Sequence, residues 1–463
     1  MKQLENKIMI LVAVLAWAFF LGACGAAPEL AQFPSGDWEL ILELEQSSHW
    51  MFVDGDAALA SAPEFMVADL PLSDIKQDRG GRRLRFDWNT PQMGLRFSME
   101  RMAHDRAPTA YEGSVIMKRH GDAGNVVGRV EMRPAGWLEE RAKKYAADRE
   151  GETLQIKGPA GVLEGTLLVP EADKDEEAET AGGRLPLVII VAGSGPTDRD
   201  GNSSLMTGRN NLLRQLAEGL QQHGIASFRY DKRGIGASKT PEGYDHATRV
   251  FQDNVDDLLL WQEYLAETGR FLPPVLLGHS EGSLVVIMAA SQAGVADGGR
   301  PVQAVISAAG NGDRIDQQLL DQLTRVDPVL AEAAGRDLER IRRGEAPQED
   351  HAGVRALFDP INLAYIRSWM QIDPARELAK VNVPVLILWG DREERVSSES
   401  SLLLAAAKPE AEYKVIAGAG HLLKPVSDDP RLAAQVWQNP SVPLAKGVME
   451  TIVDFINRRY EDG

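Results

Sequence analysis

The chain has 463 residues, of which 44% are hydrophobic and 25% are charged, and this composition argues against a disordered, collagen-like or polytopic membrane protein. Its formal net charge of −18 at pH 7 repels phosphate backbones, so nucleic acid is not expected as a partner. The single cysteine excludes a disulfide framework and a cysteine-based zinc site.

The first residues are typical of a secretory signal. Lys2 and Lys7 precede an almost unbroken apolar run, which ends in small residues, and this order defines such a segment. Leu21-Gly-Ala-Cys24 also resembles a bacterial lipobox, in which the cysteine becomes the lipidated first residue. We predict a lipoprotein signal peptide over 1–23 and lipidation of Cys24, with palmitate among its acyl chains. The mature protein would then be membrane-anchored in the cell envelope, outside the cytoplasm. The alternative is an ordinary cleaved signal.

Residues 24–150 are predicted to form a β-rich domain and a linker. Short runs of β-branched, aromatic and leucine residues are separated by turn signals, and several of them alternate apolar with polar side chains, as in a sheet with one face in water. Trp137–Arg149 reads as a short charged helix or linker. The predicted strands are Trp38–Glu45, Trp50–Val53, Leu84–Trp88, Leu95–Met99, Ser114–Met117 and Val126–Met132.

Residues 151–463 are predicted to form an α/β domain, because compact apolar runs alternate with amphipathic helical stretches such as 210–223 and 253–267. Continuous apolar runs are typical of strands buried on both faces of a parallel sheet. The acidic stretch 171–179 joins two early strands and is predicted to be a hairpin loop. The predicted strands are Leu187–Val191, Ala226–Tyr230, Val275–Leu277, Ala304–Ser307, Val385–Trp389 and Tyr413–Ile416.

One segment, about 312–380, interrupts this alternation. It has mainly helical character and is far longer than the dozen or so residues that a crossover between parallel strands needs. We therefore predict a helical lid over the carboxyl ends of the strands.

The central motif is Gly278-His-Ser-Glu-Gly282, the one G-x-S-x-G of the chain. A strand signal precedes it and an apolar helix signal follows it, which is the setting that a nucleophile elbow requires. Ser280 is therefore the predicted nucleophile. A serine hydroxyl needs a base to remove its proton, and two histidines follow Ser280 in the chain. His351 lies in a charged part of the predicted lid, so His421, in a glycine-rich loop after a strand, is the predicted base.

The third member of a triad orients the histidine and stabilises its cation. It should lie in the loop after the strand 385–389, where Asp391, Glu393 and Glu394 all compete. The spacing alone does not separate these three acids.

The predicted oxyanion hole consists of two backbone N–H groups. The first is that of Glu281, which follows the nucleophile, and the second is that of Ser194, in the glycine-rich loop after the strand 187–191.

No cofactor and no metal are expected. The stretch Asp198–Asn202 is like the start of a calcium loop, but it is followed by Ser203 and Arg209 where such a loop has glycine and glutamate. The stretch Gly234–Lys239 lacks the third glycine of a dinucleotide-binding turn.

These motifs resemble the serine α/β-hydrolase superfamily, and more closely bacterial secreted carboxylesterases that carry an N-terminal β-domain. The resemblance covers 152–463 and, more weakly, 36–133 through Pro71–Asp74. It implies a mostly parallel sheet with helices on both faces. It also favours Glu393 over Asp391, because the acid of that family stands three residues after the glycine that ends its strand; the family commonly has aspartate there. The resemblance rests on Gly193–Asn202, Tyr230–Gly234, Gly278–Gly282 and His421–Leu423.

The expected function is hydrolysis of carboxylic esters through an acyl-enzyme, with Ser280 as nucleophile, His421 as base and Glu393 as acid. The expected partners are a small-molecule acyl ester and a membrane that holds the lipid anchor. An acyl-thioesterase or a serine peptidase on the same fold is the alternative. A non-catalytic envelope protein that binds through its β-domain is a further one.

Overall fold

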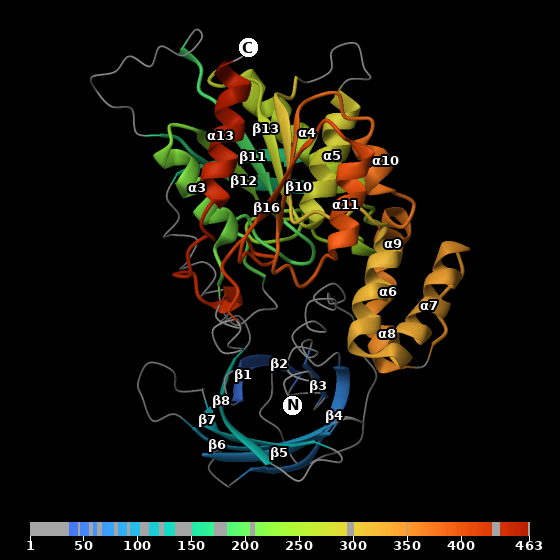
Figure 1. Ribbon diagram of the computed structural model, residues 1–463. Helices are drawn as coiled ribbons and strands as arrows, with labels where there is room; N and C mark the ends of the chain where they lie inside the picture. Colours follow the sequence, from blue (N-terminus) through green and yellow to red (C-terminus); the bar gives the residue numbers. More distant parts are fainter. Residues whose placement is uncertain are drawn as a thin grey trace.

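A computed structural model describes most of the chain (Figure 1). The predicted signal peptide, Cys24, the linker 137–149 and the acidic stretch 171–179 lie outside the described residues. No helix among the described residues is long and apolar enough to cross a bilayer. The described residues are 37–44, 47–54, 59–62, 67–77, 82–89, 93–101, 111–119, 125–134, 151–170, 183–203, 209–293, 301–349, 351–427 and 436–461.

Eight antiparallel strands at the N-terminal end form a closed barrel (Figure 1). Each strand pairs with the next one along the chain, and pairing of the first with the last closes the barrel. The alternation predicted for 84–88 is present, since Leu84 and Phe86 are buried and Arg85 is exposed. Phe86 lies opposite Phe97 on the next strand, with ring centroids 4.4 Å apart. The strands are β1 (Asp37–Leu44), β2 (Ser47–Asp54), β3 (Leu59–Ala62), β4 (Val67–Gln77), β5 (Arg83–Asn89), β6 (Met93–Arg101), β7 (Tyr111–Arg119) and β8 (Asn125–Pro134).

A second, eight-stranded sheet carries the rest of the chain, in the order β16-β15-β14-β13-β11-β12-β10-β9. Its six strands from β11 onward are parallel to one another, whereas β10 pairs antiparallel with both β12 and β9. The strands are β9 (Glu152–Gly158), β10 (Gly161–Leu168), β11 (Leu187–Val191), β12 (Ala226–Tyr230), β13 (Val275–His279), β14 (Ala304–Ala308), β15 (Val385–Gly390) and β16 (Glu412–Ile416).

The predicted hairpin across the acidic stretch 171–179 is wrong. The strands on either side of it, β10 and β11, are not neighbours, because both edges of β11 are taken by the parallel strands β12 and β13. The connection therefore passes from one side of β12 to the other.

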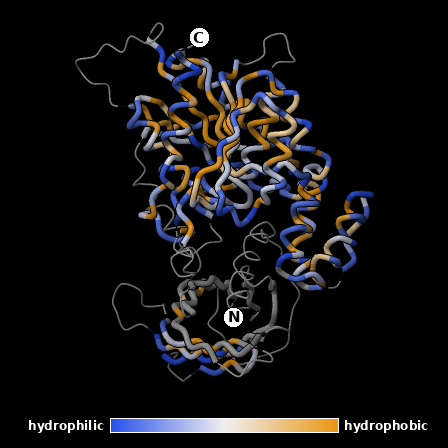
Figure 2. The backbone as a smooth tube through the Cα atoms, in the orientation of Figure 1, coloured by the Kyte–Doolittle hydropathy of each residue, from blue (hydrophilic) through white to orange (hydrophobic). Residues whose placement is uncertain are grey.

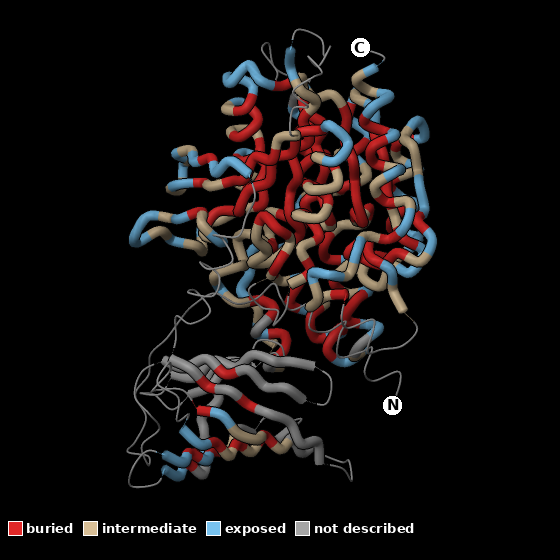
Figure 3. The backbone as a smooth tube through the Cα atoms, turned by 90° about the vertical axis from the view of Figure 1, so that its left-hand side faces the viewer, coloured by how far each residue is buried: buried red, intermediate tan, exposed pale blue. Residues whose placement is uncertain are grey.

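Helices cover both faces of this sheet, as its buried strands require. Alternate residues of β11 belong to different cores: Ile189 packs with α4 (Gln252–Glu267) and α5 (Glu281–Ala293), and Ile190 packs with α3 (Leu212–Gln222) and α13 (Val448–Glu461). The hydrophobic segments gather at the strands between the helix layers (Figure 2), and the same strands are buried (Figure 3).

A helical insertion separates β14 from β15 (Figure 1). Its two longest helices pack against each other, and α8 lies against β4 of the barrel. Asp327 caps the second of these helices by accepting from the N–H groups of Val329 and Leu330. The helices are α6 (Ile315–Val326), α7 (Pro328–Arg342), α8 (Ala352–Leu357), α9 (Leu363–Trp369) and α10 (Pro374–Leu378). After β15, α11 (Ser398–Ala407) leads to β16.

Candidate active site

Ser280 stands at a sharp turn between β13 and α5. Its φ angle of 54° lies in the left-handed region, which costs a non-glycine residue energy and is concentrated at functional sites. A Cβ atom on Gly278 would lie 2.0 Å from the carbonyl oxygen of Gly282, and one on Gly282 would lie 2.4 Å from that of Val191. The two glycines of the motif are therefore required by the close approach of three backbone segments, and they hold the strained turn.

The structure brings His421 and Glu393 together from the loops after β16 and β15. His421 Nδ1 donates to the Glu393 carboxylate, with separations of 2.9 Å and 3.1 Å to its two oxygens. The N–H groups of Arg395 and Val396 also donate to Glu393 Oε1, at 2.7 Å and 3.2 Å. Burial raises the pKa of this fully buried carboxyl, but His421 and the two N–H groups outweigh it, so the pKa of Glu393 lies below its ordinary value. The carboxylate is thus ionised at neutral pH and holds the proton of His421 on Nδ1.

The two competing acids occupy other positions. Asp391 is exposed and accepts from the N–H of Gly418 at 2.6 Å. Glu394 accepts from the backbone N–H of His421 at 3.1 Å, and burial, followed by the charge of Glu393, raises its pKa. Neither carboxylate is hydrogen-bonded to the imidazole, so the geometry favours Glu393.

A second histidine, which the sequence interpretation missed, supports the loop of His421. His279 Nε2 donates to the carbonyl oxygen of His421 at 2.8 Å, and the two rings lie 4.9 Å apart. Burial, assisted by His421, lowers the pKa of His279 to about 3, so the ring is neutral at physiological pH. The feature of the sequence that could have identified His279 is its position directly before Ser280. The remaining candidate, His351, begins α8. Its Nδ1 accepts from the N–H of Gly353 at 3.1 Å, and its carbonyl oxygen accepts from the N–H groups of Val354 and Arg355.

All but one of the residues predicted for the triad and the oxyanion hole line one pocket; the exception is Glu393, which is hydrogen-bonded to His421 and is not part of the lining. The first part of the wall comes from the loops at the carboxyl ends of the strands and from the start of α5, and the second part comes from the helical insertion. The lining residues are Ser194, Ser280, Glu281, Leu284, Asn311, Arg395 and His421 in the first part, and Ile315, Gln318, Leu319, Gln322, Trp369 and Pro374 in the second.

A buried lysine holds the loop of Ser194. Lys232 Nζ donates to the carbonyl oxygen of Gly193 at 2.6 Å and lies 3.5 Å from a carboxylate oxygen of Glu281. Burial lowers the pKa of Lys232, and Glu281 opposes that shift. A Cβ atom on Gly193 would lie 3.2 Å from Cβ of Ser280. Lys232 therefore links the two backbone segments that were predicted to form the oxyanion hole.

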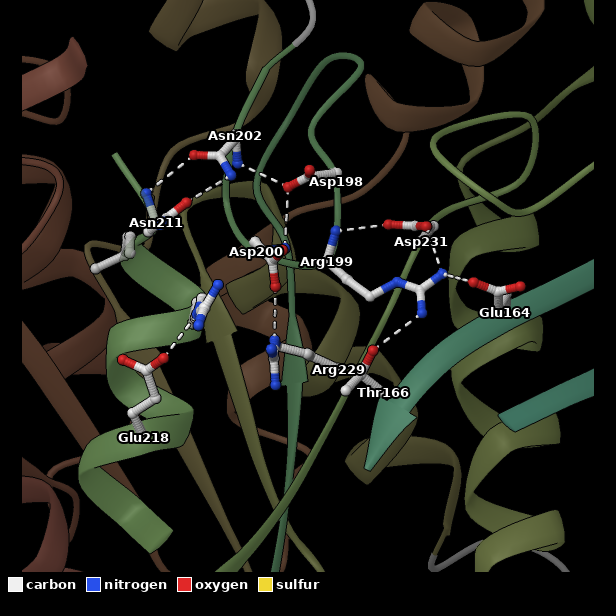
Figure 4. A network of polar contacts seen from close by, with 12 residues as sticks. Glu164, Thr166, Asp198, Arg199, Asp200, Asn202, Asn211, Glu218, Arg229 and Asp231 are labelled. Carbon is white, nitrogen blue, oxygen red and sulfur yellow. Dashed lines mark hydrogen bonds and ion pairs between the residues drawn. The ribbon is translucent and has the colours of Figure 1, made fainter. Parts of the chain in front are cut away.

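An ion-pair network secures the next part of the same loop (Figure 4). The Arg199 guanidinium is 1% exposed and donates to Asp231 at 2.6 Å, to Glu164 at 2.7 Å and to Thr166 at 3.1 Å. Its neighbour Asp200 pairs with Arg229, in an equally buried position.

Asp198, the other acid of the stretch that is like a calcium loop, is also hydrogen-bonded within the protein. Asp198 Oδ1 accepts from the N–H groups of Asp200 and Asn202, both at 2.9 Å. The network therefore fixes the backbone that follows Ser194. It was not foreseen, because its partners come from strands that are remote in the sequence.

A family model described as "Serine aminopeptidase, S33" matches residues 206–424. The esterase EstD of Thermotoga maritima is 26% identical over 282 residues, which cover 60% of this chain and 63% of EstD, less than two thirds of its length. The 2-(acetamidomethylene)succinate hydrolase of Mesorhizobium japonicum is 26% identical over 269 residues, or 54% of this chain and 91% of that protein. The structure of Est1E from Butyrivibrio proteoclasticus aligns with a TM-score of 0.41 and 18% identity, over 67% of this chain and 100% of Est1E.

Proposed function

We propose that this chain, which belongs to the serine α/β-hydrolase superfamily, hydrolyses carboxylic esters of small molecules through an acyl-enzyme intermediate. The observation that carries the proposal is the buried Glu393–His421 pair, whose imidazole lines the same pocket as Ser280 on its strained turn. A nucleophile, a base and an acid that orients the base are the parts that acyl transfer needs.

In the first half of the proposed reaction, Ser280 Oγ attacks the ester carbonyl carbon while His421 Nε2 takes the hydroxyl proton. Glu393 stabilises the imidazolium that forms, because its carboxylate lies 2.9 Å from Nδ1. The N–H groups of Glu281 and Ser194 donate to the oxyanion. His421 then gives the proton to the alcohol oxygen, the carbon–oxygen bond breaks, and the acyl group stays on Ser280.

In the second half, a water molecule attacks the acyl-enzyme while His421 takes its proton. The tetrahedral intermediate collapses, the proton passes to Ser280 Oγ, and the carboxylic acid leaves. The enzyme returns to its starting state, so the sum is ester plus water giving acid plus alcohol.

The pocket supports an ester over an aminopeptide substrate, although the matching family model is described as a serine aminopeptidase. An aminopeptidase must hold the ammonium group of its substrate, which requires an available carboxylate. Among the described lining residues, Glu281 carries the carboxylate, and this group lies 3.5 Å from Lys232. The cation Arg395 in the same lining would repel an ammonium group.

The test compares ester, thioester and amide substrates in the wild-type protein and in Ser280→Ala. We expect hydrolysis of p-nitrophenyl esters, covalent labelling by a fluorophosphonate, and loss of both in the variant, with kcat falling by about 10⁶-fold. If the wild-type protein cleaved only aminoacyl amides, the proposed esterase activity would be wrong and the protein would be a peptidase. A folded wild-type protein that neither reacts with the probe nor cleaves any acyl substrate would instead support a binding protein.

We also propose that Cys24 carries a lipid anchor, although it lies outside the described residues. Each buried CH₂ of an acyl chain contributes about 0.8 kcal/mol to membrane binding, and stable anchoring takes more than one chain. Detergent partitioning of the wild-type protein and of Cys24→Ala tests this. The wild type should enter the detergent phase, and the variant should be released or left unprocessed. A fully soluble, unlipidated wild-type protein would overturn the proposal.

A further inference from the structure

The active-site pocket contains an arginine that the proposed reaction does not use. Arg395 lines the pocket together with Ser280 and His421. Its guanidinium stacks on the ring of Trp437, with 4.3 Å from the guanidinium carbon to the ring centroid. Its Nε is buried and has no hydrogen-bond partner among the described residues. Among the residues that the structure describes, no carboxylate oxygen lies within 4.0 Å of a guanidinium nitrogen of Arg395.

Two hydrogen bonds hold the backbone of Arg395, so the position from which its side chain extends is fixed. Its N–H donates to Glu393 Oε1 at 2.7 Å, and its carbonyl oxygen accepts from Gln322 Nε2 at 2.9 Å. Gln322 lies on α6 and also lines the pocket. Arg395 is thereby clamped between the catalytic acid and the helical insertion.

Glu281 of the pocket lining, and Glu393 and Glu394, which directly precede Arg395 in the chain, each have another partner. Glu393 accepts from His421, Glu394 accepts from the backbone N–H of His421, and Glu281 lies beside Lys232. Burial lowers the pKa of Arg395, and the charges of Glu394 and Glu393 oppose that shift without a direct ion pair. Arg395 is half-buried, and a cation that is partly removed from water without a direct partner is unfavourable; a substrate anion would supply that partner.

The arginine is also close to the reacting groups. The Trp437 ring stacks against the imidazole of His421 at 6.2 Å. Because the guanidinium lies 4.3 Å from the same ring, these two separations place it at most about 10.5 Å from the imidazole. Gln318, one helical turn before Gln322, presents a second neutral donor to the pocket. A substrate of several bonds' length can therefore reach both centres.

From this geometry, and resting on the proposed ester hydrolysis, we infer that the preferred substrate is an ester that carries a carboxylate several bonds from the scissile carbonyl, and that Arg395 binds this carboxylate. Arginine presents a planar fork of N–H donors that matches a carboxylate in two parallel hydrogen bonds. Arg395 is thus a specificity residue, and it takes no part in the proton transfers.

Two isosteric substrate pairs test this inference, and they differ in where the anion lies. Monoethyl adipate and ethyl adipamate differ in the acyl part; meta-carboxyphenyl butyrate and meta-carbamoylphenyl butyrate differ in the alcohol part. We expect the wild-type kcat/KM to favour the carboxylate in at least one pair. In Arg395→Gln the ratio of the two kcat/KM values should fall about 10- to 100-fold, as for loss of a hydrogen bond to a charged group, because the carboxylate partner loses more than the amide partner. Arg395→Lys should keep part of the preference.

Arg392→Gln is the matched control, because this exposed arginine of the same loop is not among the lining residues, and it should keep the wild-type preference. Equal kcat/KM values for both members of both pairs in the wild type would overturn the inference and leave the ester hydrolysis intact. An unchanged preference in Arg395→Gln would do the same. If no ester is cleaved, the proposed function fails, and calorimetric titration of adipate into wild type and Arg395→Gln decides the anion site by itself. Should Arg395→Gln fail to fold, the wild-type substrate preference and competitive inhibition by adipate, with none by adipamide, carry the test.

Discussion

Replacing Glu393 by glutamine removes one charge from the proposed triad and leaves the shape of the side chain almost unchanged. The amide oxygen can still accept from the N–H groups of Arg395 and Val396, which lie at 2.7 Å and 3.2 Å, so the loop should keep its conformation. The imidazolium that forms at His421 loses the carboxylate that lies 2.9 Å from Nδ1.

The size of this loss follows from that separation. At an effective dielectric constant of about 20, two unit charges 2.9 Å apart attract by about 6 kcal/mol. Some of this attraction is already present between Glu393 and the neutral ring, so we expect a rise in the barrier of about 4–5 kcal/mol, or about 10³- to 10⁴-fold in kcat. This agrees with the effect of the corresponding amide substitution in a serine protease triad, about 10⁴-fold.

The assay is kcat for a p-nitrophenyl ester at neutral pH, with thermal unfolding followed by circular dichroism on the same samples. Asp391→Asn and Glu394→Gln are the matched controls. The first changes an exposed carboxylate, and the second keeps an acceptor for the His421 N–H, so both should keep most of the activity. Retention of more than about a tenth of the wild-type kcat in Glu393→Gln would refute this role of Glu393. A hundredfold loss in Asp391→Asn with Glu393→Gln active would move the acid to Asp391.

Three further predictions concern groups around the site. Arg199→Met leaves Asp231 buried without its ion-pair partner, so the free energy of unfolding should fall by about 3–5 kcal/mol in urea denaturation; a change below about 1 kcal/mol would contradict the structural role of the network. His279→Leu removes the donor to the carbonyl of His421 and should lower kcat about tenfold, and recovery of activity in His279→Gln would separate this hydrogen bond from packing. Burial lowers the pKa of Lys424 from 10.5 to about 8, so the unfolded chain binds more protons between these values and the wild-type free energy of unfolding should rise with pH across that window. Lys424→Met should lack that rise, and parallel pH profiles for the two proteins would refute it.

The interior strands of the second sheet could be predicted from the sequence because their pattern is local. Leu187–Val191 and Ala226–Tyr230 are the observed bounds of β11 and β12 as well as the predicted ones. Continuous apolar runs of this length are typical of strands that are covered on both faces of a sheet. The order of the strands was less accessible. The predicted hairpin between β10 and β11 assumed that consecutive strands are neighbours, which the chain does not obey here.

The barrel was predicted as β-structure, but its closure was not. Closure depends on pairing between β1 and β8, which are far apart in the sequence. The short strand β3 and the strand β4, with Pro71 in it, also lack a clear apolar alternation. Local pattern therefore predicted the kind of structure but not the number of strands or the ring that they form.

The proposed nucleophile and base could be picked out from the sequence, whereas spacing alone did not identify the proposed acid. The loop that follows β15 offers Asp391, Glu393 and Glu394 within four residues, and the direction of each side chain depends on the turn. The resemblance to a family favoured Glu393, and the imidazole contact agrees with that choice. Arg395 and Lys232 drew no attention, because an isolated cation in a sequence gives no sign of burial or of partners.

The placement of α6 has a consequence for how this protein can change over generations. Ile315, Gln318, Leu319 and Gln322 contribute to the pocket wall, and their spacing puts them on one side of a single helix. The groups that would carry the bond-breaking steps come instead from loops of the sheet. Mutations on one side of α6 can therefore change which substrates the pocket accepts without changing the residues proposed to carry out the reaction. A combinatorial library at those four positions is accordingly a compact starting point for laboratory evolution of substrate preference.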